Sequence, residues 1–74
     1  MADKPYISVL VPVLNEEESL PELHPRLQES LAGINKPYEI IYINDGSTDR
    51  TEQLLEAFHR EDDRVKVIEF NRNY

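Results

Sequence analysis

The feature that most constrains the fold is an alternation of short apolar runs with amphipathic stretches. Apolar and β-branched residues dominate residues 7–13, 38–43 and 65–70, which is typical of β-strands. Between these runs, apolar residues recur every three or four positions over residues 20–34 and 51–58, which predicts two helices that each bury one face. The order β-α-β-α-β predicts an α/β, Rossmann-like fold with a three-stranded parallel sheet and right-handed crossovers.

The first apolar run, Ile-Ser-Val-Leu-Val-Pro-Val over residues 7–13, has no clean alternation of apolar and polar residues. Such a run is typical of a strand that is buried on both faces, near the middle of a parallel sheet. Because proline cannot donate a hydrogen bond, we expect the strand to end at Pro12 or to leave that position unpaired.

The first helix carries its own start and stop signals. Ser19 with Glu22 has the form of a capping box, Pro25 predicts a kink or a late start, and Gly33 suits the position just beyond the helix. The predicted apolar face consists of Leu20, Leu23, Leu27, Leu31 and Ile34.

Other polar residues have simple structural interpretations. Asp49 with Glu52 repeats the capping pattern at the second helix. His24 and His59 are expected to be solvated helix residues, because neither has a second ligand at metal-binding spacing. Asp45, Ser47, Asp49 and Glu56 imitate part of a calcium loop, but Arg50 stands where such a loop requires glycine, so calcium is a minor alternative.

Charge and composition exclude several classes of partner. The chain of 74 residues has 15 Asp and Glu against 8 Lys and Arg, a formal charge of −7, which disfavours nucleic acid and anionic membranes. There is no cysteine for a disulfide framework, no secretory signal and no run of about 20 apolar residues that could span a bilayer. We therefore expect a cytoplasmic protein, or one domain piece of a larger one.

Ligands of open parallel sheets bind beyond the carboxyl ends of the strands. Here those ends lead into residues 14–18, 44–49 and 71–74. The informative segments are Val-Pro-Val-Leu-Asn-Glu over residues 11–16 and Ile-Asn-Asp-Gly-Ser-Thr-Asp-Arg-Thr over residues 43–51, which fall at the same predicted edge. Both could also be plain turns and helix starts, since Asp, Gly and Ser dominate such loops.

At these segments the chain resembles the N-terminal region of family 2 glycosyltransferases, which have the GT-A fold and use nucleotide-activated sugars. The likeness extends over essentially the whole chain. Asn-Glu-Glu-Glu-Ser-Leu over residues 15–20 and Asn-Arg-Asn-Tyr over residues 71–74 are similar to the polyprenyl-phosphate sugar transferases, the group that includes dolichyl-phosphate mannose synthase. The resemblance implies that residues 1–74 are the nucleotide-binding, N-terminal part of an incomplete GT-A domain.

The resemblance also implies roles for particular residues. Asp45 would accept a hydrogen bond from the base, and Glu16 would accept one from a ribose hydroxyl. Asn44 stands where many relatives have a first aspartate. The implied nucleotide-binding set is Pro12, Leu14, Asn15, Glu16, Asp45 and Gly46.

The donor would be a UDP- or GDP-linked sugar, with Mg²⁺ or Mn²⁺ as the cofactor of the complete enzyme. The resemblance places the metal-binding Asp-x-Asp motif and the catalytic base beyond residue 74, and no Asp-x-Asp occurs here. This segment is therefore expected to bind a nucleotide weakly and to be inactive alone, with no catalytic residue and no metal ligand. Two alternatives stay open: a stand-alone nucleotide-binding module and a structural α/β module whose loops bind nothing.

The topology predicts one more property. In the strand order 3-2-1, two right-handed crossovers place both helices on one face of the sheet. The strands carry apolar residues on both faces, so the bare face and the open edge of the first strand would expose an apolar patch. We therefore expect this chain to self-associate.

Overall fold

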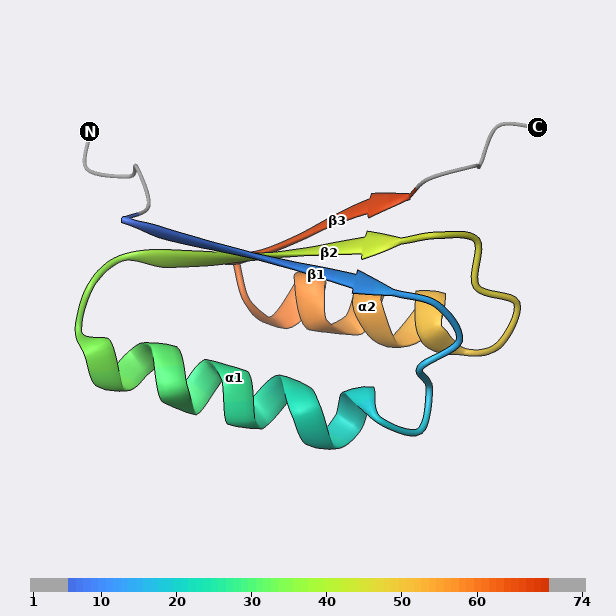
Figure 1. The fold of residues 1–74 in the computed structure, drawn as a ribbon, viewed down its shortest axis with the longest axis horizontal. Helices are drawn as coiled ribbons and strands as arrows, with labels where there is room; N and C mark the ends of the chain where they lie inside the picture. The colour runs from blue at the N-terminus through green and yellow to red at the C-terminus, as the bar shows by residue number, and fades with distance from the viewer. Residues whose placement is uncertain (1–5, 70–74) are drawn as a thin grey trace.

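The computed structural model describes residues 6–69 and has the predicted order of elements (Figure 1). The last residue expected in the third strand, Phe70, and the expected ligand-edge residues 71–74 lie outside the described part. The elements are β1 (Ile7–Val13), α1 (Leu20–Ile34), β2 (Tyr38–Asn44), α2 (Thr51–Glu61) and β3 (Val65–Glu69).

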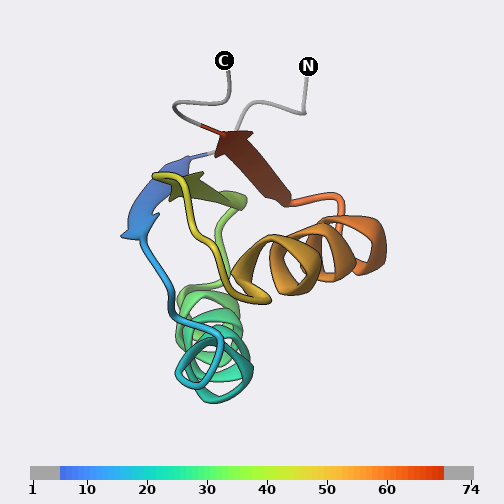
Figure 2. The same cartoon turned by 90° about the vertical axis from the view of Figure 1, so that its right-hand side faces the viewer.

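The three strands form a parallel sheet in the order β1-β2-β3, which confirms the predicted α/β architecture. Both helices lie on the same side of this sheet, and its other face carries no helix within residues 6–69 (Figure 2). Since all strands run in one direction, the loops that follow β1 and β2 emerge at the same edge.

β1 differs from its prediction because it is an edge strand with one covered face. Its odd-numbered residues face the helices, whereas Leu10 on the bare face is 59% exposed. Pro12 does not end the strand; it pairs in register with Ile43, and the strand continues to Val13. The Val13 carbonyl accepts a hydrogen bond from Asp45 N–H at 3.1 Å. Backbone groups of successive residues in a strand point to opposite sides, so those of Pro12 point to the open edge of the sheet. The missing N–H of Pro12 therefore costs no hydrogen bond to β2.

The core lies between the sheet and the two helices. Tyr42 and Ile40 in the middle strand are fully buried, and Leu55 of α2 packs against them. The buried apolar residues are Val13, Leu20, Leu31, Ile40, Tyr42, Leu55 and Val65. Leu54 and Phe58 pack against this cluster as the spacing in the second helix predicts.

His24 is buried, so its predicted solvated position is wrong. It is 5% exposed, its ring stacks on Phe58 at a centroid distance of 3.9 Å, and Nδ1 lies 2.7 Å from the Tyr42 hydroxyl. Burial lowers the pKa of His24, against a partial opposing effect of Asp62 and Glu61. Burial also raises the pKa of Tyr42 to about 12, so both groups stay neutral near pH 7.

The position of His24 also corrects the predicted apolar face of α1. His24 takes a core position together with Leu20 and Leu31, while Leu23 and Ile34 are exposed. The sequence pattern left His24 out of the apolar face because histidine counts as a polar residue. Its ring can nevertheless be buried once a hydrogen bond satisfies its nitrogen. His59, in contrast, is exposed as predicted, and its Nδ1 lies 2.7 Å from the Val65 carbonyl.

The ends of α1 also differ from the predicted signals. Ser19 takes the N-cap position, but its side chain makes no capping hydrogen bond. The helix begins at Leu20, well before Pro25, so there is no late start. Gly33 lies inside the helix, and Asn35 instead adopts the left-handed conformation that ends it, with a φ of 63°. Asparagine tolerates this conformation better than most residues with a side chain.

Candidate functional site

The candidate site is formed by two loops at the carboxyl edge of the sheet. The first loop, residues 14–19, connects β1 to α1, and the second loop, residues 45–50, connects β2 to α2. The two loops meet at the right-hand end of the sheet in Figure 1. The structure therefore brings together the two segments that the sequence singled out.

Asn15 connects the two loops from the side nearest the strands. Its φ of 52° is left-handed, which turns the first loop toward the second. Its backbone N–H donates to Ser47 Oγ at 2.9 Å, and its side-chain oxygen accepts from Thr48 N–H at 2.8 Å. Asn15 thus donates one hydrogen bond to the second loop and accepts one from it, which fixes the two loops to each other.

Glu16 and Glu17 are tied to the start of α2. The backbone N–H of Glu16 donates to Thr51 Oγ1 at 2.8 Å, and that of Glu17 donates to Asp49 Oδ2 at 3.3 Å. Glu17 returns a bond, since its Oε1 accepts from Arg50 N–H at 2.8 Å. The side chains of Asp49 and Thr51 therefore satisfy two backbone donors of the first loop.

Asp49 accepts hydrogen bonds from two backbone N–H groups, those of Glu17 and Thr51. Its Oδ1 accepts from Thr51 N–H at 2.8 Å, a backbone donor at the start of α2. The predicted capping pattern is wrong in its position, because the N-cap of α2 is Arg50, whose side chain makes no capping hydrogen bond. Desolvation raises the pKa of Asp49, but hydrogen bonds from the Thr51 hydroxyl and from backbone N–H groups outweigh that effect and lower the pKa below its ordinary value. Asp49 is therefore an ionised acceptor near neutral pH.

Asn44 shapes the turn that carries Asp45. Asn44 is 1% exposed, and its side chain accepts from Ser47 N–H at 3.2 Å and donates to Glu69 Oε1 at 3.2 Å. Gly46 has a φ of 82°, which a residue with a side chain rarely adopts. Because the side chain of Asn44 is used inside the protein and Asp45 is exposed, Asp45 is the better placed of the two to meet a ligand.

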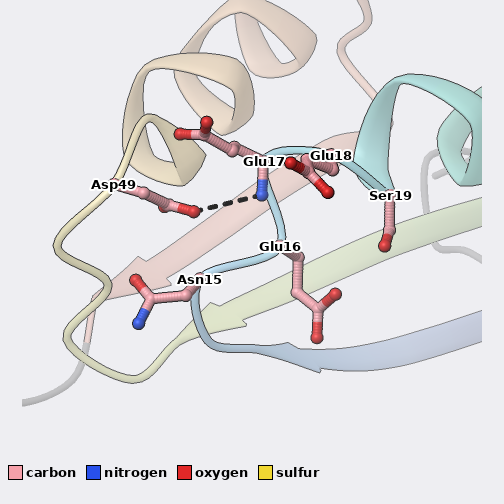
Figure 3. Close-up of a pocket in the computed structure, with 6 residues that line it drawn as sticks. All are labelled: Asn15, Glu16, Glu17, Glu18, Ser19 and Asp49. Atoms are coloured by element: carbon pink, nitrogen blue, oxygen red, sulfur yellow. Dashed lines mark hydrogen bonds between the residues drawn. The ribbon is translucent and has the colours of Figure 1, made fainter.

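An acidic pocket of about 280 Å³ lies between the first loop and Asp49 (Figure 3). Of the predicted nucleotide-binding residues, only Asn15 and Glu16 line it. Its lining consists of Asn15, Glu16, Glu17, Glu18, Ser19 and Asp49. Four carboxylates around one pocket repel phosphate, so the pocket alone does not suit the diphosphate of a nucleotide.

The remaining predicted residues do not line this pocket. Leu14 is exposed at the start of the first loop, Pro12 is exposed on the bare face of β1, and Asp45 and Gly46 are exposed on the second loop. Sequence reasoning missed the linking roles of Ser47, Thr48 and Thr51. Their side chains are common in turns, and only the tertiary pairing of the loops shows which groups they bind.

Within residues 6–69, no group of three or more His, Cys, Asp or Glu side chains is arranged to hold a metal ion. Glu17 and Asp49, which come from different loops, point their oxygens at backbone N–H groups. Neither of the two described helices has the length and apolar character needed to cross a membrane.

Comparison with known proteins places the chain among glycosyltransferases. It is 46% identical over 69 residues to the undecaprenyl-phosphate 4-deoxy-4-formamido-L-arabinose transferase of Proteus mirabilis, covering 92% of this chain and 21% of that protein. It is 42% identical over 67 residues to the uncharacterized glycosyltransferase YkcC of Bacillus subtilis, covering 90% of this chain and 21% of that protein. The chain thus spans about a fifth of the length of these relatives.

A solved structure shows the same fold. The crystal structure of residues 1–349 of S. aureus TarS matches 90% of this chain and 19% of its own chain, with a TM-score of 0.65 and 33% identity. The model of the family described as "Glycosyl transferase family 2" matches residues 8–74. The expected resemblance is confirmed, and the chain belongs to glycosyl transferase family 2.

Proposed function

We propose that this chain is the donor-binding part of a glycosyltransferase that transfers a sugar from a UDP- or GDP-linked donor to a polyprenyl phosphate. The observation that carries the proposal is the hydrogen-bonded pairing of the two loops, which holds Glu16 and Asp45 at one edge of the sheet. That edge is where open parallel sheets bind ligands. Family membership supports the reaction type.

In this proposal the nucleoside lies across both loops. Asp45 accepts a hydrogen bond from a base N–H, and Glu16 accepts one from a ribose hydroxyl. A hydrogen bond to a carboxylate contributes about 1.5–3 kcal/mol. Gly46 allows the backbone to turn beside the base, and Pro12, Leu14 and Asn15 provide the remaining surface for base and ribose.

The diphosphate of a nucleotide-activated sugar needs a cation, for which residues 6–69 offer no arranged ligands. The carboxylates around the acidic pocket would repel a phosphate, and residues 6–69 contain no arranged metal-ligand group. We therefore assign Mg²⁺ or Mn²⁺ to ligands outside the described residues. Nucleotide binding by this chain alone is consequently weak, in the millimolar range or above, and without turnover.

The acceptor and the place of action follow from similarity. The name of the relative from Proteus mirabilis specifies an undecaprenyl phosphate, and a 46% identity over 69 residues supports an acceptor of the same chemical class here. A polyprenyl phosphate resides in a membrane, so the proposed reaction takes place at a membrane surface, for which we propose the cytoplasmic face.

Self-association belongs to the same proposal. The bare face presents Leu10, Ile41 and Ile68 between the charged residues Glu39 and Lys66. A face that carries both signs of charge around an apolar centre can pair with a second copy of itself. Light scattering across a concentration series should show growing mass, and Leu10→Ser should reduce it. A monomer of unchanged mass at high concentration would contradict this part.

Titration tests the donor-binding proposal. UDP and GDP are added to the isotopically labelled chain with and without Mg²⁺, and amide shifts are followed. We expect fast-exchange shifts with a Kd in the millimolar range that Mg²⁺ changes little. Micromolar binding that requires the metal would overturn the assignment of the metal ligands, and no shift with either nucleotide would overturn donor binding itself.

A further inference from the structure

The Thr51 side chain is a buried polar group at an otherwise exposed edge. Thr51 is the first residue of α2 and is fully buried, whereas Asn15, Glu16 and Asp45 around it are exposed. Thr51 therefore has no surface to offer to a nucleotide. Any effect of this residue on ligand binding must pass through the groups that it holds.

The hydrogen-bond directions around Thr51 follow from simple chemistry. A hydroxyl has a single hydrogen to donate, and an ionised carboxylate only accepts. Thr51 Oγ1 accepts from Glu16 N–H at 2.8 Å, so its own hydrogen is left to bond the carboxylate of Asp49, whose Oδ1 also accepts from Thr51 N–H. The result is a directed chain from the Glu16 backbone through the Thr51 hydroxyl to the Asp49 carboxylate.

Asp49 extends this chain to the next residue of the first loop. Its Oδ2 accepts from Glu17 N–H, while its Oδ1 accepts from Thr51 N–H. Two successive backbone donors of the first loop, those of Glu16 and Glu17, are thus bound by Thr51 at the start of α2 and by Asp49 just before it. Because α2 packs into the core through Leu55, the backbone of Glu16 is fixed to the rigid part of the molecule.

We propose that Thr51 and Asp49 are positioning residues, which hold Glu16 in the orientation that binds the ribose of the donor. This inference rests on the proposed function. Without the Thr51 hydroxyl, the Glu16 N–H loses its acceptor and the first loop is free to move relative to Asp45. A nucleoside that must meet both carboxylates at once then binds a less organised site.

The matched variants are Thr51→Val, which keeps the shape and removes the hydroxyl, and Thr51→Ser, which keeps the hydroxyl. Amide hydrogen exchange in the labelled 74-residue chain reads the hydrogen bond directly. We expect Thr51→Val to speed exchange at Glu16 by about three- to tenfold, the loss of one neutral hydrogen bond. Thr51→Ser should stay within about twofold of the parent chain.

UDP titration of the same samples measures how each substitution changes the affinity for the nucleotide. Thr51→Val should weaken the UDP Kd by about three- to tenfold, with Thr51→Ser restoring it. Asp49→Asn is the second variant: it keeps the size but exchanges one acceptor for a donor, so either Glu17 or Thr51 loses protection. Ser30→Ala serves as the control, because Ser30 is an exposed hydroxyl residue on α1, outside both loops.

The outcomes separate the inference from the proposed function. If the parent chain binds UDP and Thr51→Val binds it equally well, positioning by Thr51 is refuted while donor binding stands. If Thr51→Ser is as weak as Thr51→Val, the residue acts through packing and the inference fails. If the parent chain shows no shift with UDP or GDP, the proposed function and the inference fall together, whatever the exchange at Glu16 shows.

Discussion

The core beneath the sheet and the loop edge are held together by different interactions. The core around Tyr42 consists of apolar side chains together with the buried, hydrogen-bonded pair His24 and Tyr42. The loop edge has little apolar packing, and backbone N–H groups donate to side-chain oxygens across the two loops. Substitutions in the core should therefore change folding stability, and substitutions at the edge should change ligand binding.

The largest effect is expected in the core. Leu55→Ala removes a fully buried side chain and should lower the free energy of unfolding by about 2–5 kcal/mol. Leu23→Ala is the matched control: Leu23 is 42% exposed, and the same truncation there should change stability by only about 0.5 kcal/mol. Urea denaturation measures both, and equal losses would show that the assigned buried face of α1 or α2 is wrong.

Asp45→Asn should produce the opposite pattern at the loop edge. It keeps the shape of the side chain and removes the charge proposed to meet the base. The expected loss in donor binding is about 1.5–3 kcal/mol, or roughly 10- to 150-fold, with little change in stability. The UDP Kd and the melting temperature are compared in one sample. A lower melting temperature with an unchanged Kd would indicate that Asp45 only shapes the turn.

A smaller effect on stability is expected from substituting the two glycines, one in α1 and one in the second loop. A Cβ added to Gly33 or Gly46 meets no atom within 4 Å, so the two sites differ in backbone conformation rather than in space. Gly33→Ala lies inside α1 and should stabilise the chain by about 0.5–1 kcal/mol. Gly46→Ala has a φ of 82° and should destabilise it by about 1–2 kcal/mol. Thermal unfolding shows the signs, and a common sign would refute the assigned conformations.

The mildest perturbation leaves the sequence unchanged and varies only pH. Burial lowers the pKa of folded His24 below 6.5, so the unfolded chain takes up a proton first as pH falls. The stabilisation that comes from keeping His24 neutral in the core is therefore fully present above the pKa of His24 in the unfolded chain. It decreases as pH drops from about 6.5 toward the lower pKa of His24 in the folded chain. Denaturation at several pH values should show this slope.

Paired variants identify the source of the pH slope. His24→Gln should flatten it, whereas Leu23→Ala, a truncation at an exposed position of the same helix, should leave it in place. A slope that survives His24→Gln would assign the pH dependence to the carboxylates instead of to the buried imidazole.

The sequence predicted the sheet and the location of the loops well because both depend on local pattern and chain direction. Alternating apolar runs determined the parallel order, and the strand ends then placed Asn15, Glu16 and Asp45 at one edge. His24 could not be placed in the same way. Its burial depends on the Tyr42 hydroxyl and the Phe58 ring, which belong to other elements.

The hydrogen-bond partners of the loop side chains could not be predicted from the sequence either, for a physical reason. Ser19 has the residue type of an N-cap but no capping bond, whereas Thr51 accepts from a residue 35 positions away. Small hydroxyl side chains suit caps, turns and cross-loop bonds equally well. Only the approach of the two loops determines which of these bonds forms.

The most direct test of the account is a map of UDP-induced amide shifts over the whole labelled chain. A nucleoside that lies across both loops should shift residues 14–16 and residues 45–47 together, with one common Kd. Asp45→Asn should weaken both sets equally. Shifts at one loop alone would contradict the account, as would shifts centred on the pocket of about 380 Å³ at the opposite edge, which Tyr38 and Arg64 help to line.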